Sequence, residues 1–222
     1  MGQQIRQKTK LVESTKKADI VFCIDNSGSM SDCIDGVRET VGDFVSTLET
    51  GAGGQSPVDW RIGLVNYSDE EFIFLDLLNE TSTFKNKLGK SVKGYDEYTP
   101  GAIDYAISKT SWREGSQRII VVFTDETLET GAGGGNRFDD LLAKIVNSHI
   151  QIIYYGPDCK YYRKFEQCPK CEVNIVSDFS GVSFDALMNR LAVTVSSGNA
   201  FAGKDPVDKK QVYRMTFIKI SK

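Results

Sequence analysis

Short apolar runs alternate with amphipathic segments over most of this chain. Residues 18–25 (ADIVFCID) and 118–125 (RIIVVFTD) are continuous apolar runs that end on a carboxylate, and residues 150–155 form a third run. Runs of this kind, rich in β-branched residues, are typical of strands buried on both faces of a parallel sheet. Residues 172–176 predict a last, shorter strand.

Two further segments alternate between apolar and polar positions. They are residues 59–67 and 72–77, and the acidic turn 68–71 separates them. This pattern predicts a hairpin, which would place one antiparallel strand at an edge of the sheet.

Helical spacing of apolar side chains follows the first run, at Val37, Val41, Phe44, Val45 and Leu48. Ser31 or Asp32 can cap this helix. Similar reasoning predicts helices over residues 83–88, 100–112, 137–148 and 183–197. Strands that alternate with helices indicate βαβ units. The predicted fold class is therefore α/β, a three-layer, Rossmann-like, doubly wound sheet that is mainly parallel, with one antiparallel edge strand and helices on both faces.

The length of 222 residues suits one such domain with extensions. We place the domain at residues 18–197, between a polar N-terminal extension (1–17) and a C-terminal extension (198–222). Within the latter, residues 212–220 alternate like a strand with no evident partner.

Composition narrows the possible partners and the compartment. The net charge of −3 argues against nucleic acid as the main partner, because phosphate binding needs a concentrated basic surface. No segment approaches the roughly 18 apolar residues of a membrane span, so no membrane association is expected. The first 17 residues lack the apolar stretch of a secretory signal, and the five cysteines are too few for a disulfide scaffold. We therefore expect a cytoplasmic protein.

A cluster of oxygen donors is predicted in the loop between the first strand and the helix that follows it. Asp25, Ser27 and Ser29 stand two residues apart, with Gly28 expected to let the backbone turn tightly between them. Asp125 ends another apolar run, and Thr99 lies just before a helix, so both are expected at the same edge of the sheet. Hard oxygen donors of this kind suit Mg²⁺ or Mn²⁺.

A structural interpretation stands beside this one. Serines and aspartates are common helix caps, so Ser27, Ser29 and Asp25 could simply shape the turn before the helix. A cap needs one such residue, however, and not five positions from three segments, which favours a metal site.

These residues resemble a known family. Asp-x-Ser-x-Ser after the first buried strand, followed by Thr99 and Asp125, is similar to the metal-ion-dependent adhesion site (MIDAS) of von Willebrand factor A (VWA) domains, and the resemblance covers residues 18–197. It implies a fold of the predicted class and a divalent cation, Mg²⁺ or alternatively Mn²⁺ or Ca²⁺. Ser27 and Ser29 would bind the cation directly, as would Thr99 in the high-affinity arrangement.

In the same family Asp25 and Asp125 would act mostly through water, and an Asp or Glu of a partner protein would complete the coordination. Glu126 departs from the pattern, because the family often has glycine there. It adds negative charge beside the predicted cation.

The cysteines suggest a second site. Cys168 and Cys171 have half of a zinc-knuckle spacing, and Cys159 is nearby in sequence. Structural Zn²⁺ needs a fourth ligand, for which Cys33 or Asp158 is conceivable. His149 is a poor choice, since it precedes a strand and should lie at the opposite end of the sheet. Thiols without a metal, or a disulfide, are the alternatives.

The sequence thus predicts a metal-dependent protein-binding module, such as an intracellular adaptor or regulatory subunit, and not an enzyme. A serine hydrolase would need His149 near Ser27, which the strand order opposes. Two alternatives stay open. One is a metal-assisted phosphoryl hydrolase that uses Asp25 and Asp125, and the other is a scaffold whose metal only pins loops.

Overall fold

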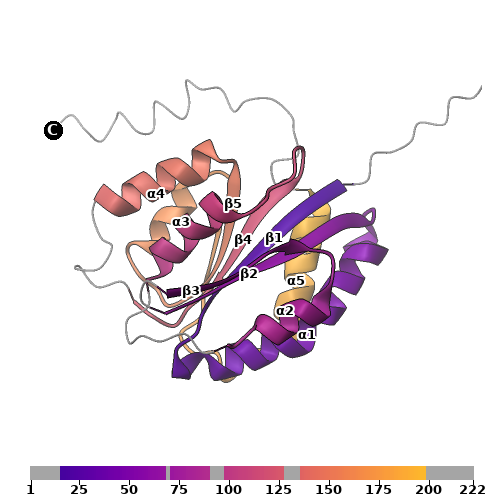
Figure 1. Cartoon of the computed structure of the whole chain (residues 1–222), viewed down its shortest axis with the longest axis horizontal. Coiled ribbons are helices and arrows are strands. Elements are labelled where there is room, and N and C mark those ends of the chain that lie inside the picture. The colour runs from indigo at the N-terminus through magenta and orange to yellow at the C-terminus, as the bar shows by residue number, and fades with distance from the viewer. Residues whose placement is uncertain (1–15, 69–70, 91–97, 128–135, 199–222) are drawn as a thin grey trace, which may run out of the picture.

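A six-stranded sheet with helices on both faces forms the domain (Figure 1). The computed structural model describes residues 16–68, 71–90, 98–127 and 136–198. The strands are β1 (Lys16–Asp25), β2 (Val58–Ser68), β3 (Glu71–Leu78), β4 (Gln117–Phe123), β5 (Ile150–Gly156) and β6 (Glu172–Ile175). The α-helices are α1 (Ser31–Thr50), α2 (Thr81–Lys87), α3 (Thr99–Lys109), α4 (Asn136–Asn147) and α5 (Phe184–Ser197).

The strand order is β3-β2-β1-β4-β5-β6, with only β3 antiparallel to its neighbour. β1 lies between β2 and β4, and eight of its ten residues are buried, because helices cover both of its faces. This burial explains its continuous apolar sequence. The expected α/β class, with a mainly parallel sheet and one antiparallel edge strand, is confirmed.

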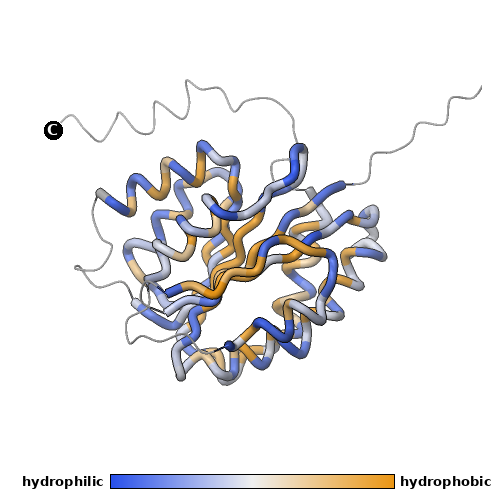
Figure 2. Tube along the Cα trace, viewed as in Figure 1, coloured by the Kyte–Doolittle hydropathy of each residue, from blue (hydrophilic) through white to orange (hydrophobic). Residues whose placement is uncertain are grey.

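Two apolar layers enclose the sheet. Phe22 and Ile24 of β1 face α1 and α5, where Phe44 and Leu191 pack. Val21 and Cys23 face α3 and α4 on the other side. Figure 2 shows hydrophobic residues concentrated along the central strands of the sheet. Cys23 is fully buried.

Most predicted elements lie within a few residues of their observed positions. The helix predicted over residues 100–112 is wrong at its end, because α3 stops at Lys109. Beyond it the chain turns toward β1, where the backbone N–H of Arg113 donates to Asp19 at 2.7 Å. The first strand begins at Lys16, two residues into the predicted extension, since Lys16 pairs with Val58. The strand expected at 212–220 falls outside the described residues.

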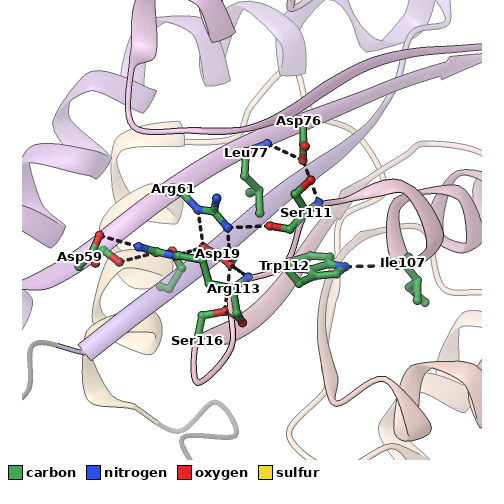
Figure 3. A network of polar contacts seen from close by, with 11 residues as sticks. Asp19, Asp59, Arg61, Asp76, Leu77, Ile107, Ser111, Trp112, Arg113 and Ser116 are labelled. Atoms are coloured by element: carbon green, nitrogen blue, oxygen red, sulfur yellow. Dashed lines mark hydrogen bonds and ion pairs between the residues drawn. The ribbon is translucent and has the colours of Figure 1, made fainter.

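A buried ionic network holds this turn against the start of β1 (Figure 3). Asp19 is fully buried and accepts hydrogen bonds from the guanidinium groups of Arg61 (3.0 and 2.9 Å) and Arg113 (2.9 Å). Ser116 donates a further bond to it at 2.9 Å. Although burial opposes ionisation, these donors lower the pKa of Asp19 below its ordinary value. The network therefore joins β1, β2 and the segment between α3 and β4.

Over the part of the chain that the structure describes, none of the helices combines the length and apolar character that crossing a membrane requires.

Candidate metal centre

The predicted ligands gather where the chain order of the sheet reverses. From β1 the chain continues to β2 on one side, whereas β4, β5 and β6 are added on the other. Ligands of open α/β sheets bind outside the carboxyl ends of the strands at such a point. Asp25 is the last residue of β1, and β4, which ends at Phe123, is its parallel neighbour.

The loop after β1 is a compact turn built on hydrogen bonds. The backbone N–H of Ser27 donates to Asp25 Oδ1 at 2.8 Å, and that of Met30 donates to the Ser27 carbonyl at 3.1 Å. A short 3₁₀ turn, η1 (Gly28–Met30), follows. It brings the hydroxyl oxygens of Ser27 and Ser29 to 3.0 Å from each other.

This separation fits two ligands of one small cation. Magnesium binds oxygen at about 2.1 Å in octahedral geometry, so two neighbouring ligand oxygens stand about 3 Å apart. The Ser27 and Ser29 hydroxyls have this separation, and Ser29 is exposed to solvent. The pair can therefore hold a cation without rearranging the turn, provided that each hydroxyl directs a lone pair to it.

Asp25 is a buried carboxylate that lacks a cationic partner among the described residues. Burial raises its pKa to about 6 against the hydrogen bonds from Ser27 and Thr124, and the nearby charge of Asp125 raises it further. A buried charge is costly unless it is paired or binds a metal. The centre therefore favours a positive ion at this edge of the sheet.

Thr99 reaches the centre through a residue that the sequence analysis did not single out. Thr99 is the first residue of α3 and fully buried, and its hydroxyl lies 2.7 Å from the hydroxyl of Tyr67. Tyr67 is the register partner of Asp25 on β2. Burial, and then the charge of Asp25, raises the pKa of Tyr67 well above its ordinary value, so its hydroxyl stays protonated.

The sequence predicted that Asp125 ends a strand. In the structure it does not, because β4 stops at Phe123. Thr124 comes next, and its hydroxyl donates to Asp25 Oδ2 at 3.0 Å. It also accepts the backbone N–H of Glu126 at 3.1 Å. Asp125 itself is half-buried and close enough to raise the pKa of both Asp25 and Cys33.

Sequence reasoning thus missed Tyr67 and Thr124. The available signal was their position, since each hydroxyl lies at or next to the end of a predicted strand, where Asp25 was also expected. Hydrogen bonds join Ser29, Ser27, Asp25 and Thr124 in one polar cluster, and the charge of Asp125 acts on Asp25. Thr99 is hydrogen-bonded to Tyr67, the register partner of Asp25 on β2.

Comparison with known families agrees with this arrangement. The sequence profile of the von Willebrand factor type A domain matches residues 19–190. The chain belongs to this family. VWA domains are protein-interaction modules, and some of them hold a metal in a MIDAS. The comparison with curated protein sequences gives no match.

Solved structures of VWA proteins share the fold at low sequence identity. Proximal thread matrix protein 1 from the mussel byssus has a TM-score of 0.60 at 13% identity, over 82% of this chain and 47% of its own. A von Willebrand factor type A protein from Catenulispora acidiphila has a TM-score of 0.62 at 14% identity, over 80% and 42%. The chain thus spans less than half of these proteins. For the SpRpn10 VWA domain the TM-score is 0.58 at 14% identity, over 78% of this chain and 94% of that domain.

Gly28 has a different role from the expected one. Its φ is not positive, and a Cβ atom built there meets nothing within 4 Å, so the turn does not require glycine. Because alanine restricts the unfolded chain, Gly28→Ala is expected to leave stability unchanged or raise it by about 0.4–1 kcal/mol. Urea unfolding of this VWA domain measures the effect. A loss of more than about 1 kcal/mol would restore the turn interpretation.

The predicted zinc ligands are placed in and beside the core. Cys159 and Cys168 are buried in the apolar layer that contains Tyr162 and Phe165, and Cys171 Sγ accepts the backbone N–H of Ile152 at 3.2 Å. All five cysteines are thiols, with no disulfide bond among them.

The structure shows no clustering that would support zinc. Among the described residues, no group of three or more His, Cys, Asp or Glu side chains is arranged to hold a metal ion. The zinc site stays a prediction without geometric support. The residues of the predicted MIDAS differ from such a group, since most of their donors are hydroxyls.

Proposed function

We propose that this VWA domain binds a partner protein through a divalent cation, Mg²⁺ in the first instance. Asp25, Ser27, Ser29, Thr99 and Asp125 would hold the cation, and an Asp or Glu of the partner would complete its coordination. The observation that supports this most directly is the fully buried Asp25 carboxylate, whose pKa is raised to about 6 and which forms no ion pair with the described basic residues.

The hydroxyl groups of the centre suit direct contact with the cation. The Thr99 hydroxyl can donate its proton to the Tyr67 oxygen, 2.7 Å away, and keep its lone pairs for the ion. Ser27 and Ser29 have neutral oxygens 3.0 Å apart. A cation held mainly by neutral oxygens keeps much of its charge and so attracts an incoming carboxylate.

Asp25 is placed to act on the cation without binding it directly. Its Oδ1 accepts the Ser27 backbone N–H and its Oδ2 accepts the Thr124 hydroxyl. Both oxygens are thus already engaged in orienting the loops on either side. This supports a role in which Asp25 supplies charge and positions its neighbours.

The related fold offers further support for a cation. The structure of the mussel byssus protein with a zinc-occupied MIDAS motif has a TM-score of 0.59 at 15% identity over 80% of this chain. We propose that the present chain uses its centre for binding and not for catalysis, as an adaptor or regulatory subunit inside the cell.

Thr99→Ala tests this function, with Thr99→Ser as its matched control. The wild-type chain and Thr99→Ser are expected to retain the same partner proteins from a cell extract in Mg²⁺, because both have a hydroxyl at the centre. Thr99→Ala is expected to lose at least about tenfold of this retention, the loss expected when one good charge-assisted contact of about 1.4 kcal/mol is removed. Quantitative mass spectrometry of the retained proteins measures it.

EDTA separates binding from a loop-pinning role. If the cation binds the partner, chelation releases the partner from the wild-type chain. Partner retention that survives both EDTA and Thr99→Ala, together with a lower melting temperature in EDTA, would show instead that the metal only stabilises the loops.

A further inference from the structure

A basic groove lies beside the metal centre, between α2 and the edge strand β3. It has a volume of about 470 Å³ and is lined by Ile73, Thr83, Asn86, Lys87 and Lys90. We refer to it as the α2 groove. Its exposed charged side chains are the two lysines.

Two asparagines fix the α2 groove to the centre. The side-chain amide of Asn26 donates to the Lys90 carbonyl at 2.9 Å, and that of Asn66 donates to the Lys87 carbonyl at 3.0 Å. Asn26 stands between Asp25 and Ser27, so the backbone of Lys90 contacts the loop after β1 that contains the predicted ligands. The groove and the centre are therefore neighbouring parts of one surface.

The two lysines have no acidic partner within the described part of the chain. Other described basic residues do form ion pairs, among them Arg38, Arg61, Arg113, Lys144, Arg163 and Lys164. Lysines near the end of a helix can offset its dipole, but this effect falls off beyond the last turn. Lys90 lies beyond the end of α2 and is not explained in this way.

Charge is distributed unevenly across the centre. The α2 groove lies on the β2 and β3 side of β1, whereas Asp125 and Glu126 follow β4 on the other side. An acidic segment that crosses the centre meets like charge on the β4 side, whereas on the α2 side it meets Lys87 and Lys90, with the exposed Glu71 at the start of β3. Electrostatic complementarity of this kind selects the orientation of a partner.

We propose that the α2 groove receives further acidic residues of the partner, beside the one that completes the metal site. The partner segment is then an acidic peptide that runs from the centre toward Lys90 and Lys87. This inference rests on the proposed function. An extended chain advances about 3.3 Å per residue, so acidic residues a few positions from the metal-bound one can reach the groove.

Synthetic peptides test the proposal in solution. One peptide has a single glutamate in a Gly/Ser background, and the second has several consecutive glutamates in the same background. Each is titrated into the ¹⁵N-labelled full chain in Mg²⁺, and amide chemical shifts report both affinity and location. The variants are Lys87→Glu/Lys90→Glu and, as control, Lys109→Glu, an exposed lysine on α3 that forms no ion pair with the described residues.

We expect the wild-type chain to bind the multiply acidic peptide more tightly, by about 1.5- to 5-fold for each lysine engaged. The Lys87→Glu/Lys90→Glu variant should lose this gain and keep its affinity for the singly acidic peptide, whereas Lys109→Glu should behave like the wild-type chain. Higher salt should reduce the gain.

Three results would overturn the proposal or its basis. Equal Mg²⁺-dependent affinity for both peptides would overturn the role of the groove and leave the proposed function intact. Similar shifts at Lys87 and Lys90 with inorganic phosphate would show a simple anion site. Lysine-dependent binding that persists unchanged in EDTA would keep the basic groove and overturn the metal-dependent function.

Discussion

Asp25→Asn is expected to make the metal-free domain more stable at neutral pH while abolishing its stabilisation by Mg²⁺. The folded state raises the pKa of Asp25 from 3.8 to about 6, chiefly because the carboxylate is buried. The folded state therefore binds more protons than the unfolded state between these values, and stability falls as the pH rises through that window. Asparagine removes the charge but can still accept the Ser27 N–H. At pH 7.5 the gain is up to about 3 kcal/mol, since one pKa unit corresponds to about 1.4 kcal/mol.

Urea unfolding in EDTA and in Mg²⁺, at pH 4.5 and 7.5, measures both parts of this expectation. The gain should be small at the lower pH, where Asp25 is mostly protonated. Asp25→Ala is the control, because it also leaves the Ser27 N–H without its acceptor and should be less stable than Asp25→Asn. If Asp25→Asn were clearly destabilised in EDTA at pH 7.5, Asp25 would be a structural turn residue and not a metal-site carboxylate.

Asp19→Ala is expected to destabilise the domain by about 3–5 kcal/mol, the cost of breaking a buried ion pair by removing one partner. The guanidinium groups of Arg61 and Arg113 would lose their shared acceptor beneath the turn that follows α3. The effect on Mg²⁺ affinity should be small, because Asp19 lies toward the start of β1 and the centre lies at its end.

The contribution of Asp19 to the stability of the domain should depend on pH in the opposite direction to that of Asp25. The folded state lowers the pKa of Asp19 below 3.8, so its contribution is fully present above that value and disappears as the pH falls through the folded pKa. Asp59→Ala is the matched control, since Asp59 is exposed and its pairing with Arg113 contributes about 1 kcal/mol or less. Similar losses for the two variants would mean that burial of Asp19 has little weight.

The fold could be predicted because its central strands are buried on both faces. A strand such as β1 or β4 then reads as a continuous apolar run, and the helices between the runs determine a parallel sheet. The edge of the sheet was predictable for the same reason, since Asp25 ends one of these runs. The end of α3 could not be predicted in this way. Beyond it, the backbone N–H of Arg113 is hydrogen-bonded to the buried carboxylate of Asp19, which is far away in sequence.

The residues of the candidate site could be proposed from the sequence, but the residues that support them could not. Ser27 and Ser29 belong to a local motif, so their proximity follows from a short turn. Tyr67 and Thr124 act across neighbouring strands, and only the register of the sheet places them beside Thr99 and Asp25. Register depends on side-chain packing over the whole sheet, which a single strand's pattern does not contain.

A crystal structure of the full chain grown with Mn²⁺ tests the central claim most directly, because the anomalous signal of manganese locates the ion without assumptions about its ligands. The account predicts one peak at the carboxyl end of β1, in contact with the hydroxyl oxygens of Ser27, Ser29 and Thr99. It would be contradicted by crystals without a peak at this position, or with a peak elsewhere that Ser27, Ser29 and Thr99 do not contact.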